Sequence, residues 1–265
     1  DTLTEAQQLA LAGAERHEVT FYSGLNGTGS IVTDPSAPGA TVLSLVIRRS
    51  LDVDVLNTTA TGVVNADSGT TLFLGSEESI LVDRIDAGGD AIIKVQKDIF
   101  DGRANPDGII TDADVNIISN DLILEAEQGD IGADGSPLLI HVSAGSTLVA
   151  RAADEIHISV KDYGGESGDV NVVSVNAQNV IKFSADGSIY DADNDDLTTE
   201  FWNFTTGELH LTAGDHIGSA GHFVEIDLSG KIYANAGLNI YLSEVGQETP
   251  DGGVMLVGNK IGRAH

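Results

Sequence analysis

The sequence predicts an all-β fold, a parallel β-helix (β-solenoid), and three observations lead to it. From Val19 onward apolar and polar residues alternate almost throughout, which is typical of strands with one buried face. No helical segment of crossover length separates these strands, so alternating β–α units are excluded. The whole pattern also returns in register about every 85 residues. Repeated units that cannot bury their apolar faces alone stack into one continuous core.

The repeat also predicts the size of the solenoid. Coils in stacked repeats span roughly 20–25 residues, so each cycle contains about four coils and the 265-residue chain about twelve. Residues 51–265 form one continuous, repeat-containing domain. Residues 1–50 form irregular or divergent coils, in which residues 1–17 fit either a short helix or a pair of strands. Because the chain begins with Asp1 and carries no signal peptide, we expect a segment of a longer or processed protein.

The core positions of the repeat are pairs of alternating apolar residues. Three such pairs follow one another at intervals of 84 residues: Leu72 and Leu74, Ile156 and Ile158, and Ile240 and Leu242. Alternate residues of a strand point to the same side. We therefore expect all six side chains to point into the core, and the three pairs to occupy equivalent coil positions on one face.

Charge and composition exclude several classes of partner. The chain has 41 acidic and 13 basic residues, a formal net charge of −28, whereas nucleic acids and anionic membrane surfaces require clustered Lys and Arg. No cysteine occurs, so neither disulfides nor thiolate chemistry contribute. No apolar run reaches the ~18 residues of a membrane-spanning helix. We expect a soluble protein with no nucleic-acid partner and no membrane insertion.

An acidic loop in the second cycle is a candidate calcium site. Asp191, Asp193 and Asp195 alternate along one turn, and hard cations require several oxygens from a short segment. However, Trp202 stands where a calcium loop would place its bidentate Glu, and Arg103 interrupts the corresponding loop of the first cycle. A solvated turn rich in Asp, Asn and Gly remains the alternative.

Other candidate ligand groups favour structural roles. His210, His216 and His222 are evenly spaced, but His210 aligns with Ile123 and is expected to face solvent, which argues against a metal site. Trp202 and Phe204 align with apolar residues of the other copy and are expected to fill the core rather than to bind a sugar.

Catalytic signatures do not emerge from the sequence. There is no G-x-S-x-G, no H-E-x-x-H and no P-loop, and the basic residues are scattered rather than gathered near paired carboxylates. We therefore predict that the protein is not an enzyme. The alternatives are a carbohydrate-active β-helix enzyme, either a polysaccharide lyase or a hydrolase, and a calcium-stabilised structural module.

The glycine turns and the strands that follow them resemble a known family. Gly129 to Val142, Ser146 to Ala150, Glu155 to Ser159 and Gly187 to Ala192 resemble the repeats of filamentous-haemagglutinin-type giant surface proteins of bacteria. The resemblance covers residues 51–242 and not the first fifty. It implies a right-handed parallel β-helix, export to the cell surface or the medium, and adhesive or structural work.

The predicted function is thus a non-catalytic structural or adhesive segment of an exported bacterial filament protein, located outside the cell or on its surface. Its expected partners are further repeats or copies of itself, joined end to end, and glycans or proteins of host or neighbouring cells. No cofactor is expected apart from calcium at the acidic loop.

Overall fold

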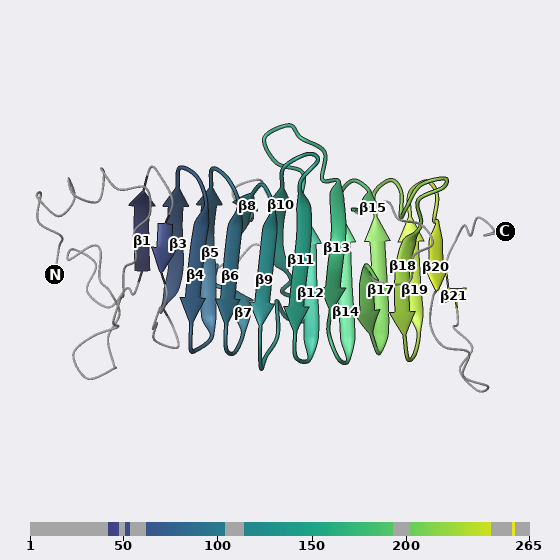
Figure 1. Cartoon of the computed structure of the whole chain (residues 1–265), viewed down its shortest axis with the longest axis horizontal. Coiled ribbons are helices and arrows are strands. Elements are labelled where there is room, and N and C mark those ends of the chain that lie inside the picture. The colour runs from purple at the N-terminus through teal and green to yellow at the C-terminus, as the bar shows by residue number, and fades with distance from the viewer. Residues whose placement is uncertain are drawn as a thin grey trace, which may run out of the picture.

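The computed structural model describes residues 42–47, 51–53, 62–103, 114–192, 202–244 and 256–257 (Figure 1). Every element in these residues is a strand. The strands are β1 (Val42–Ile47), β2 (Leu51–Val53), β3 (Val63–Ser68), β4 (Leu72–Ser76), β5 (Ile80–Ala87), β6 (Ala91–Val95), β7 (Ile99–Asp101), β8 (Ile117–Ser119), β9 (Leu122–Ala126), β10 (Leu138–Val142), β11 (Thr147–Ala152), β12 (Glu155–Val160), β13 (Val170–Asn176), β14 (Val180–Ala185), β15 (Ile189–Asp191), β16 (Phe204–Thr206), β17 (Glu208–Ala213), β18 (Val224–Leu228), β19 (Ile232–Ala236), β20 (Leu242–Glu244) and β21 (Leu256–Val257).

The strands form two sheets, and the chain passes back and forth between them. Sheet 1 has the order β1-β3-β5-β8-β10-β12-β14-β17-β19-β21, with β7 also paired to β5. Sheet 2 has the order β2-β4-β6-β9-β11-β13-β16-β18-β20, with β15 also paired to β13. The pairings between these strands are parallel, and the strands lie side by side along the long axis of the molecule (Figure 1). The predicted all-β parallel solenoid is confirmed, whereas its right-handedness and its twelve coils stay predictions.

One hydrophobic core runs between the two sheets. It consists of the inward-facing residues of the strands, almost all Ile, Leu, Val and Ala, with Phe183 and Phe204 as its largest fully buried side chains. Their rings meet edge to face at a centroid distance of 5.4 Å. Strands alternate because one side of each faces this core, and turns rich in Gly, Ser and Asp connect them. Phe204 fills the core as predicted, while Trp202 is half-buried.

Each repeat makes seven passes through the two sheets, which corresponds to three and a half coils. Strands β5 to β12 form one cycle and β13 to β20 the next. Because β7 and β8 both pair with β5, they make a single pass through sheet 1, so the cycle makes seven passes through the two sheets. An odd number of passes places each strand of the second cycle in the opposite sheet from its counterpart in the first. Thus β12 lies in sheet 1 and β20 in sheet 2.

The odd number of passes also determines which sheet holds each of the predicted core pairs. Leu72, Leu74, Ile156, Ile158 and Ile240 are at most 5% exposed, and Leu242 is partly buried against the core, so the inward orientation is confirmed. The expectation that the three pairs share one face is wrong. The first pair lies in β4 of sheet 2, the second in β12 of sheet 1, and Leu242 in β20 of sheet 2.

The pairs are nevertheless equivalent within the repeat, as a ladder of isoleucines shows. Ile131 forms parallel bridges with Ile99 and Ile156, and in the next cycle Ile217 forms them with Ile189 and Ile240. The backbone hydrogen bonds around the two ladders correspond one to one. Ile131 donates to the Glu155 carbonyl at 3.1 Å and Ile217 to the Asn239 carbonyl at 2.9 Å.

A buried asparagine in each cycle bridges an interrupted strand. In sheet 1, β7 and β8 are separate strands that both pair with β5, and Asn116, which is completely buried, immediately precedes β8. Its Nδ2 donates to the Val82 carbonyl and to Asp101 Oδ1, both at 2.8 Å, while its Oδ1 accepts from the Leu139 amide at 2.8 Å. A side-chain amide offers the same donor and acceptor as a peptide group, so Asn116 links the strands on either side of the gap.

The second cycle repeats this arrangement in sheet 2. Asn203 donates to the Val172 carbonyl at 2.8 Å and to Asp191 Oδ1 at 3.0 Å, and accepts from the Glu225 amide at 2.7 Å. The sequence aligns residues 115–117 with 202–204, but nothing in its pattern distinguishes this asparagine from a turn residue.

Candidate functional site

The candidate site is a row of polar side chains on the outer face of sheet 1. His157, Lys182, His210 and Tyr233 occupy the same register position on β12, β14, β17 and β19, one residue on each successive coil. Adjacent strands of a sheet are about 4.7–4.9 Å apart, so these side chains stand at that spacing along the long axis. Alternation forces this orientation, because Ile156, Ile158 and their neighbours point inward. We call these four residues the outer row.

A tight hairpin forms one wall of the site. After Ile131 the chain turns outward, and Ala133 and Ser136 exchange backbone hydrogen bonds at 3.0 and 2.9 Å. Gly132 makes the turn possible, because its φ is +67° and a Cβ there would lie 2.1 Å from the His157 carbonyl oxygen. The hairpin lies beside His157, which is only 3% exposed although it points away from the core.

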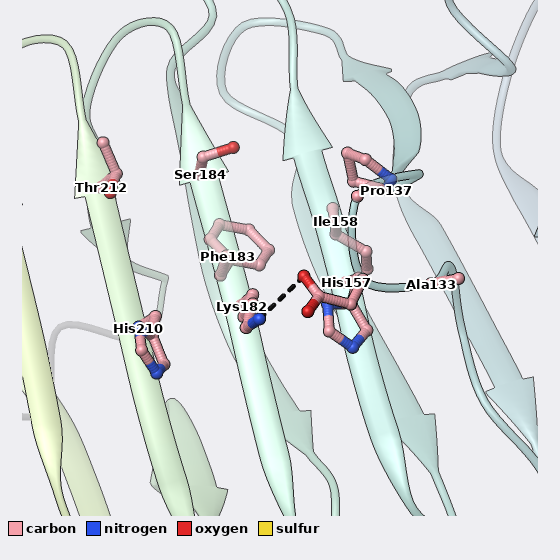
Figure 2. Close-up of a pocket in the computed structure, with 11 residues that line it drawn as sticks. Ala133, Pro137, His157, Ile158, Lys182, Phe183, Ser184, His210 and Thr212 are labelled. Atoms are coloured by element: carbon pink, nitrogen blue, oxygen red, sulfur yellow. Dashed lines mark hydrogen bonds and ion pairs between the residues drawn. The ribbon is translucent and has the colours of Figure 1, made fainter.

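The hairpin and the outer row enclose an open hollow of about 240 Å³. Its wall is the hairpin, with Ala133 and Pro137, and its floor holds His157, Lys182 and His210, as Figure 2 shows. Ser184 and Thr212 also line the hollow, each two residues further along its strand than Lys182 and His210. Binding pockets that enclose a whole small ligand have volumes of roughly 300–1,000 Å³, so this hollow fits one ring or a short segment of a longer ligand.

Each basic or imidazole group of the hollow has a carboxylate partner. Lys182 Nζ donates to Asp134 Oδ1 at 2.8 Å, His157 Nε2 lies 2.8 Å from Glu155 Oε2, and His210 Nε2 lies 2.7 Å from Glu208 Oε1. The hydrogen bond from the Lys182 ammonium holds the pKa of Asp134 below its usual value. Counted with neutral imidazoles, the three carboxylates and one lysine give the site a formal charge of −2.

The far end of the outer row is an aromatic surface. The rings of His210 and Tyr233 stack at a centroid distance of 4.4 Å and an interplanar angle of 19°. Both side chains are half-buried, so part of each ring remains accessible to solvent. A flat aromatic surface with polar tips combines apolar contact area with hydrogen-bonding groups.

A second polar cluster on the same sheet has a structural role. Tyr163 lies at the base of another tight hairpin, and its ring packs 5.4 Å from His141. Arg84 Nη2 donates to the Tyr163 hydroxyl at 2.9 Å, with the guanidinium 5.3 Å from the ring centroid. Glu166 Oε2 approaches His141 Nε2 at 3.5 Å. These contacts hold the hairpin down over the 3%-exposed His141.

The calcium candidates are only partly within the described residues. Asp191 ends β15, and its Oδ1 accepts the hydrogen bond from Asn203, while Asp193 and Asp195 lie outside the described residues. In the described part of the chain, no three His, Asp or Glu side chains are positioned to hold a metal ion. The calcium site therefore stays a prediction.

The corresponding acidic position of the first cycle is neutralised by an arginine. Arg103 Nε and Nη2 donate to the two oxygens of Asp101 at 2.9 and 3.0 Å. Burial raises the pKa of Asp101, but the hydrogen bonds from Arg103 and Asn116 outweigh burial and lower it overall. In the register of the repeat, Arg103 corresponds to Asp193.

Sequence reasoning missed the outer row, apart from the outward orientation of His210, which is confirmed. Its members lie 25, 28 and 23 residues apart, so no fixed spacing connects them. A signal was present one repeat earlier in the chain, where Phe73, Ile92, Ile123 and Val149 align with one another on β4, β6, β9 and β11. The polar side chains of the outer row thus stand at positions where the preceding repeat has apolar side chains.

These features define the class of protein: a β-solenoid built from a duplicated unit of three and a half coils, with a polar hollow on one outer face. The chain matches no protein-family model, and comparisons with the curated proteins and with the solved structures found no match. Within the described residues, no helix has the length and hydrophobicity needed to span a membrane.

Proposed function

We propose that this protein is a non-catalytic, rod-forming segment of an exported bacterial surface protein, and that its outer faces serve adhesion. The proposal rests on a comparison of the two repeats: their buried elements are the same, whereas their outward-facing residues differ. Buried elements recur in both cycles: the isoleucine ladder, the bridging asparagine and the glycine before the hairpin. Outward-facing residues differ, as the change from Ile123 to His210 illustrates.

A scaffold explains this division. Retained core residues keep the coils stacking, while free variation outside lets each copy present different contacts. A catalytic device would instead need a fixed constellation of outer side chains. The resemblance to filamentous-haemagglutinin-type repeats supports the same class, and it supports the expected right-handedness and the surface location.

The junction between the cycles supports extension into longer rods. Strand β11 of the first cycle pairs with β13 of the second, and β12 pairs with β14 through six consecutive residue pairs. This junction is as fully paired as contacts within a cycle, such as β9 with β11. Further cycles can therefore be added, or copies joined end to end, through the same pairing.

The hollow also favours a second candidate function, a carbohydrate-active enzyme. Asp134, Lys182 and His157 bring a carboxylate, an ammonium and an imidazole to one concave place, and such groups can act as general acids and bases. Opposing this candidate, Asp134 is occupied by Lys182, and its lowered pKa makes it a poor general acid.

The location of the protein tests the proposal directly. An antibody against the purified chain should label intact cells of the organism that makes it, without permeabilisation. Labelling only after permeabilisation would contradict the surface role. Incubation of the chain with a panel of neutral and acidic polysaccharides should release no shorter products. Product release would replace the proposal with the enzymatic candidate.

A further inference from the structure

We propose that the outer row and its hollow bind an uncharged, hydroxyl-rich oligosaccharide that lies along the long axis of the solenoid. This inference deepens the adhesive role and rests on it, because it names the ligand class of that role. The first argument is geometric. The row offers one side chain per coil at the strand spacing of about 4.8 Å, so a linear polymer laid along it meets a new contact on each coil.

The second argument concerns the size and shape of the hollow. At about 240 Å³ and open to solvent, it cannot enclose a whole ligand. It can accept the end ring of a chain while the next rings rest on the outer row in the direction of Tyr233. The hairpin at Ala133 and Pro137 stands on the coil before His157, so it ends the row on that side and leaves the direction toward Lys182 and His210 free (Figure 2).

The third argument is the match between chemical groups. The stacked rings of His210 and Tyr233 supply a flat surface for the C–H face of a sugar ring. Beside it, carboxylate acceptors at Asp134 and Glu208 and the Lys182 ammonium donor match hydroxyl groups, which both donate and accept. Because the ion pairs already hold these side chains in place, binding does not have to order them.

The fourth argument selects an uncharged ligand. The site has a formal charge of −2, and the whole chain carries −28, so a polyanionic glycan is repelled at long range and at contact. Among the described residues that line the hollow, Lys182 is the only lysine or arginine, and its charge is shared with Asp134. Ser184 and Thr212 add hydroxyl groups at the edge of the hollow, and these groups can exchange hydrogen bonds with the hydroxyls of a sugar.

Four uncharged hexasaccharides test the inference on the full 265-residue chain: cellohexaose, maltohexaose, mannohexaose and chitohexaose, with hexagalacturonate as the charged arm. Calorimetric titration should show binding of at least one uncharged probe and weaker binding of hexagalacturonate. Tyr233→Ala should weaken binding roughly three- to tenfold, the loss expected for one aromatic contact. Tyr233→Phe should retain it, because the ring surface is unchanged.

A matched control and a second variant keep the test decisive. Tyr190→Ala makes the same change on β15 of sheet 2 and should leave binding unaltered. If Tyr233→Ala fails to fold by circular dichroism, Lys182→Gln on the other side of the hollow replaces it and should also weaken binding. No binding of any uncharged probe, preference for hexagalacturonate, or equal loss in Tyr190→Ala would overturn the inference.

The same titrations separate this inference from the proposed function. Mass spectrometry of the bound hexasaccharide should find it intact, which supports both. A cleaved hexasaccharide would support the binding row and overturn the non-catalytic role. Absence from the cell surface would remove the adhesive role while leaving the measured affinity unchanged.

Discussion

The outer faces of the two cycles differ far more than their interiors. On sheet 2, β4, β6, β9 and β11 present a half-buried apolar row, with Phe73 and Val149 at its ends. One repeat later, the same positions carry His157 and Tyr233 on sheet 1. The inward residues stay apolar, although Phe204 takes the place of the smaller Ile117. The difference shows that stacking of the coils constrains the inward-facing residues of each strand, whereas the outward-facing residues are free to change.

The corners of the coils diverge in the same way. Near the first isoleucine ladder, Asp130 accepts a hydrogen bond from the Glu155 amide at 2.9 Å, and its own amide donates to Asp98 at 3.0 Å. In the second cycle His216 takes the place of Asp130, and Asn239 that of Glu155. The backbone path is the same in both cycles, but an acidic corner has become a neutral one.

The largest expected effect tests whether equivalent core positions are equally constrained. Ile158→Asp should destabilise the protein by several kcal/mol, because an unpaired carboxylate enters a site that is 1% exposed. Leu242→Asp, at the equivalent position of the next cycle, should cost much less, because Leu242 is only partly buried and its carboxylate can reach water. Urea unfolding followed by circular dichroism measures both. Equal costs would show that the two positions are not distinguished by burial.

The bridging asparagines should behave alike in the two cycles. Asn116→Ala and Asn203→Ala each leave a buried amide, of Leu139 or of Glu225, without its acceptor, and each should cost about 1–3 kcal/mol. Urea midpoints provide the comparison. A loss below about 0.5 kcal/mol in either variant would contradict the bridging role.

The acidic loops should respond differently to calcium. Arg103 neutralises Asp101 in the first cycle, whereas Asp193 stands at the corresponding place in the second, so a bound cation would perform the task of the guanidinium there. A chelator should then lower the melting temperature by about 2–4 °C, the shift that roughly 1 kcal/mol produces in a protein of about this size. Asp193→Ala should remove that sensitivity. A melting temperature that the chelator does not change would contradict the calcium site and favour a solvated turn.

The smallest expected effect concerns the acidic corner. Burial and the charges of Asp154, Asp98 and Glu155 raise the pKa of Asp130, despite the hydrogen bond from Glu155. A raised carboxyl pKa favours folding below the unfolded value of 3.8, and this contribution is lost as the pH rises through the folded pKa. Asp130→Asn should therefore stabilise the protein at pH 7, by less than about 1 kcal/mol because solvent screens the site.

Thermal melting across pH checks this sign. The variant should melt above the unaltered protein at pH 7 and together with it near pH 3, where Asp130 is protonated. A variant that is less stable at pH 7 would mean that the hydrogen bond to the Glu155 amide needs the charge of the carboxylate.

Much of the fold could be predicted from the sequence, because alternation and the 84-residue interval act through local physics. Each of Leu72, Ile156 and Ile240 is buried as its strand pattern requires. Their distribution over two sheets could not be predicted, since strands of the same alternation fit coils with two or with three sides. The number of passes depends on the positions of the turns and of the strand interruptions. The pattern of apolar residues indicates neither of these positions.

The candidate site was harder to predict for a related reason. Stacking brings Lys182 beside His210, although 28 residues separate them in the sequence. They are close because of the register in which β14 pairs with β17, and this register cannot be derived from a single sequence. The hairpin at Ala133 to Ser136 gave a visible glycine signal, but the residue that it covers, His157, belongs to the next coil.

A unit of three and a half coils has a consequence for valency. Successive units of such a rod advance by about 17 Å and turn by half a revolution, so a contact present in every unit would appear alternately on opposite flanks. One flat surface could then engage only every second unit. Two surfaces, however, could be held at once, one on each side of the rod. Such a rod gains avidity mainly by joining two partners rather than by gripping one more tightly.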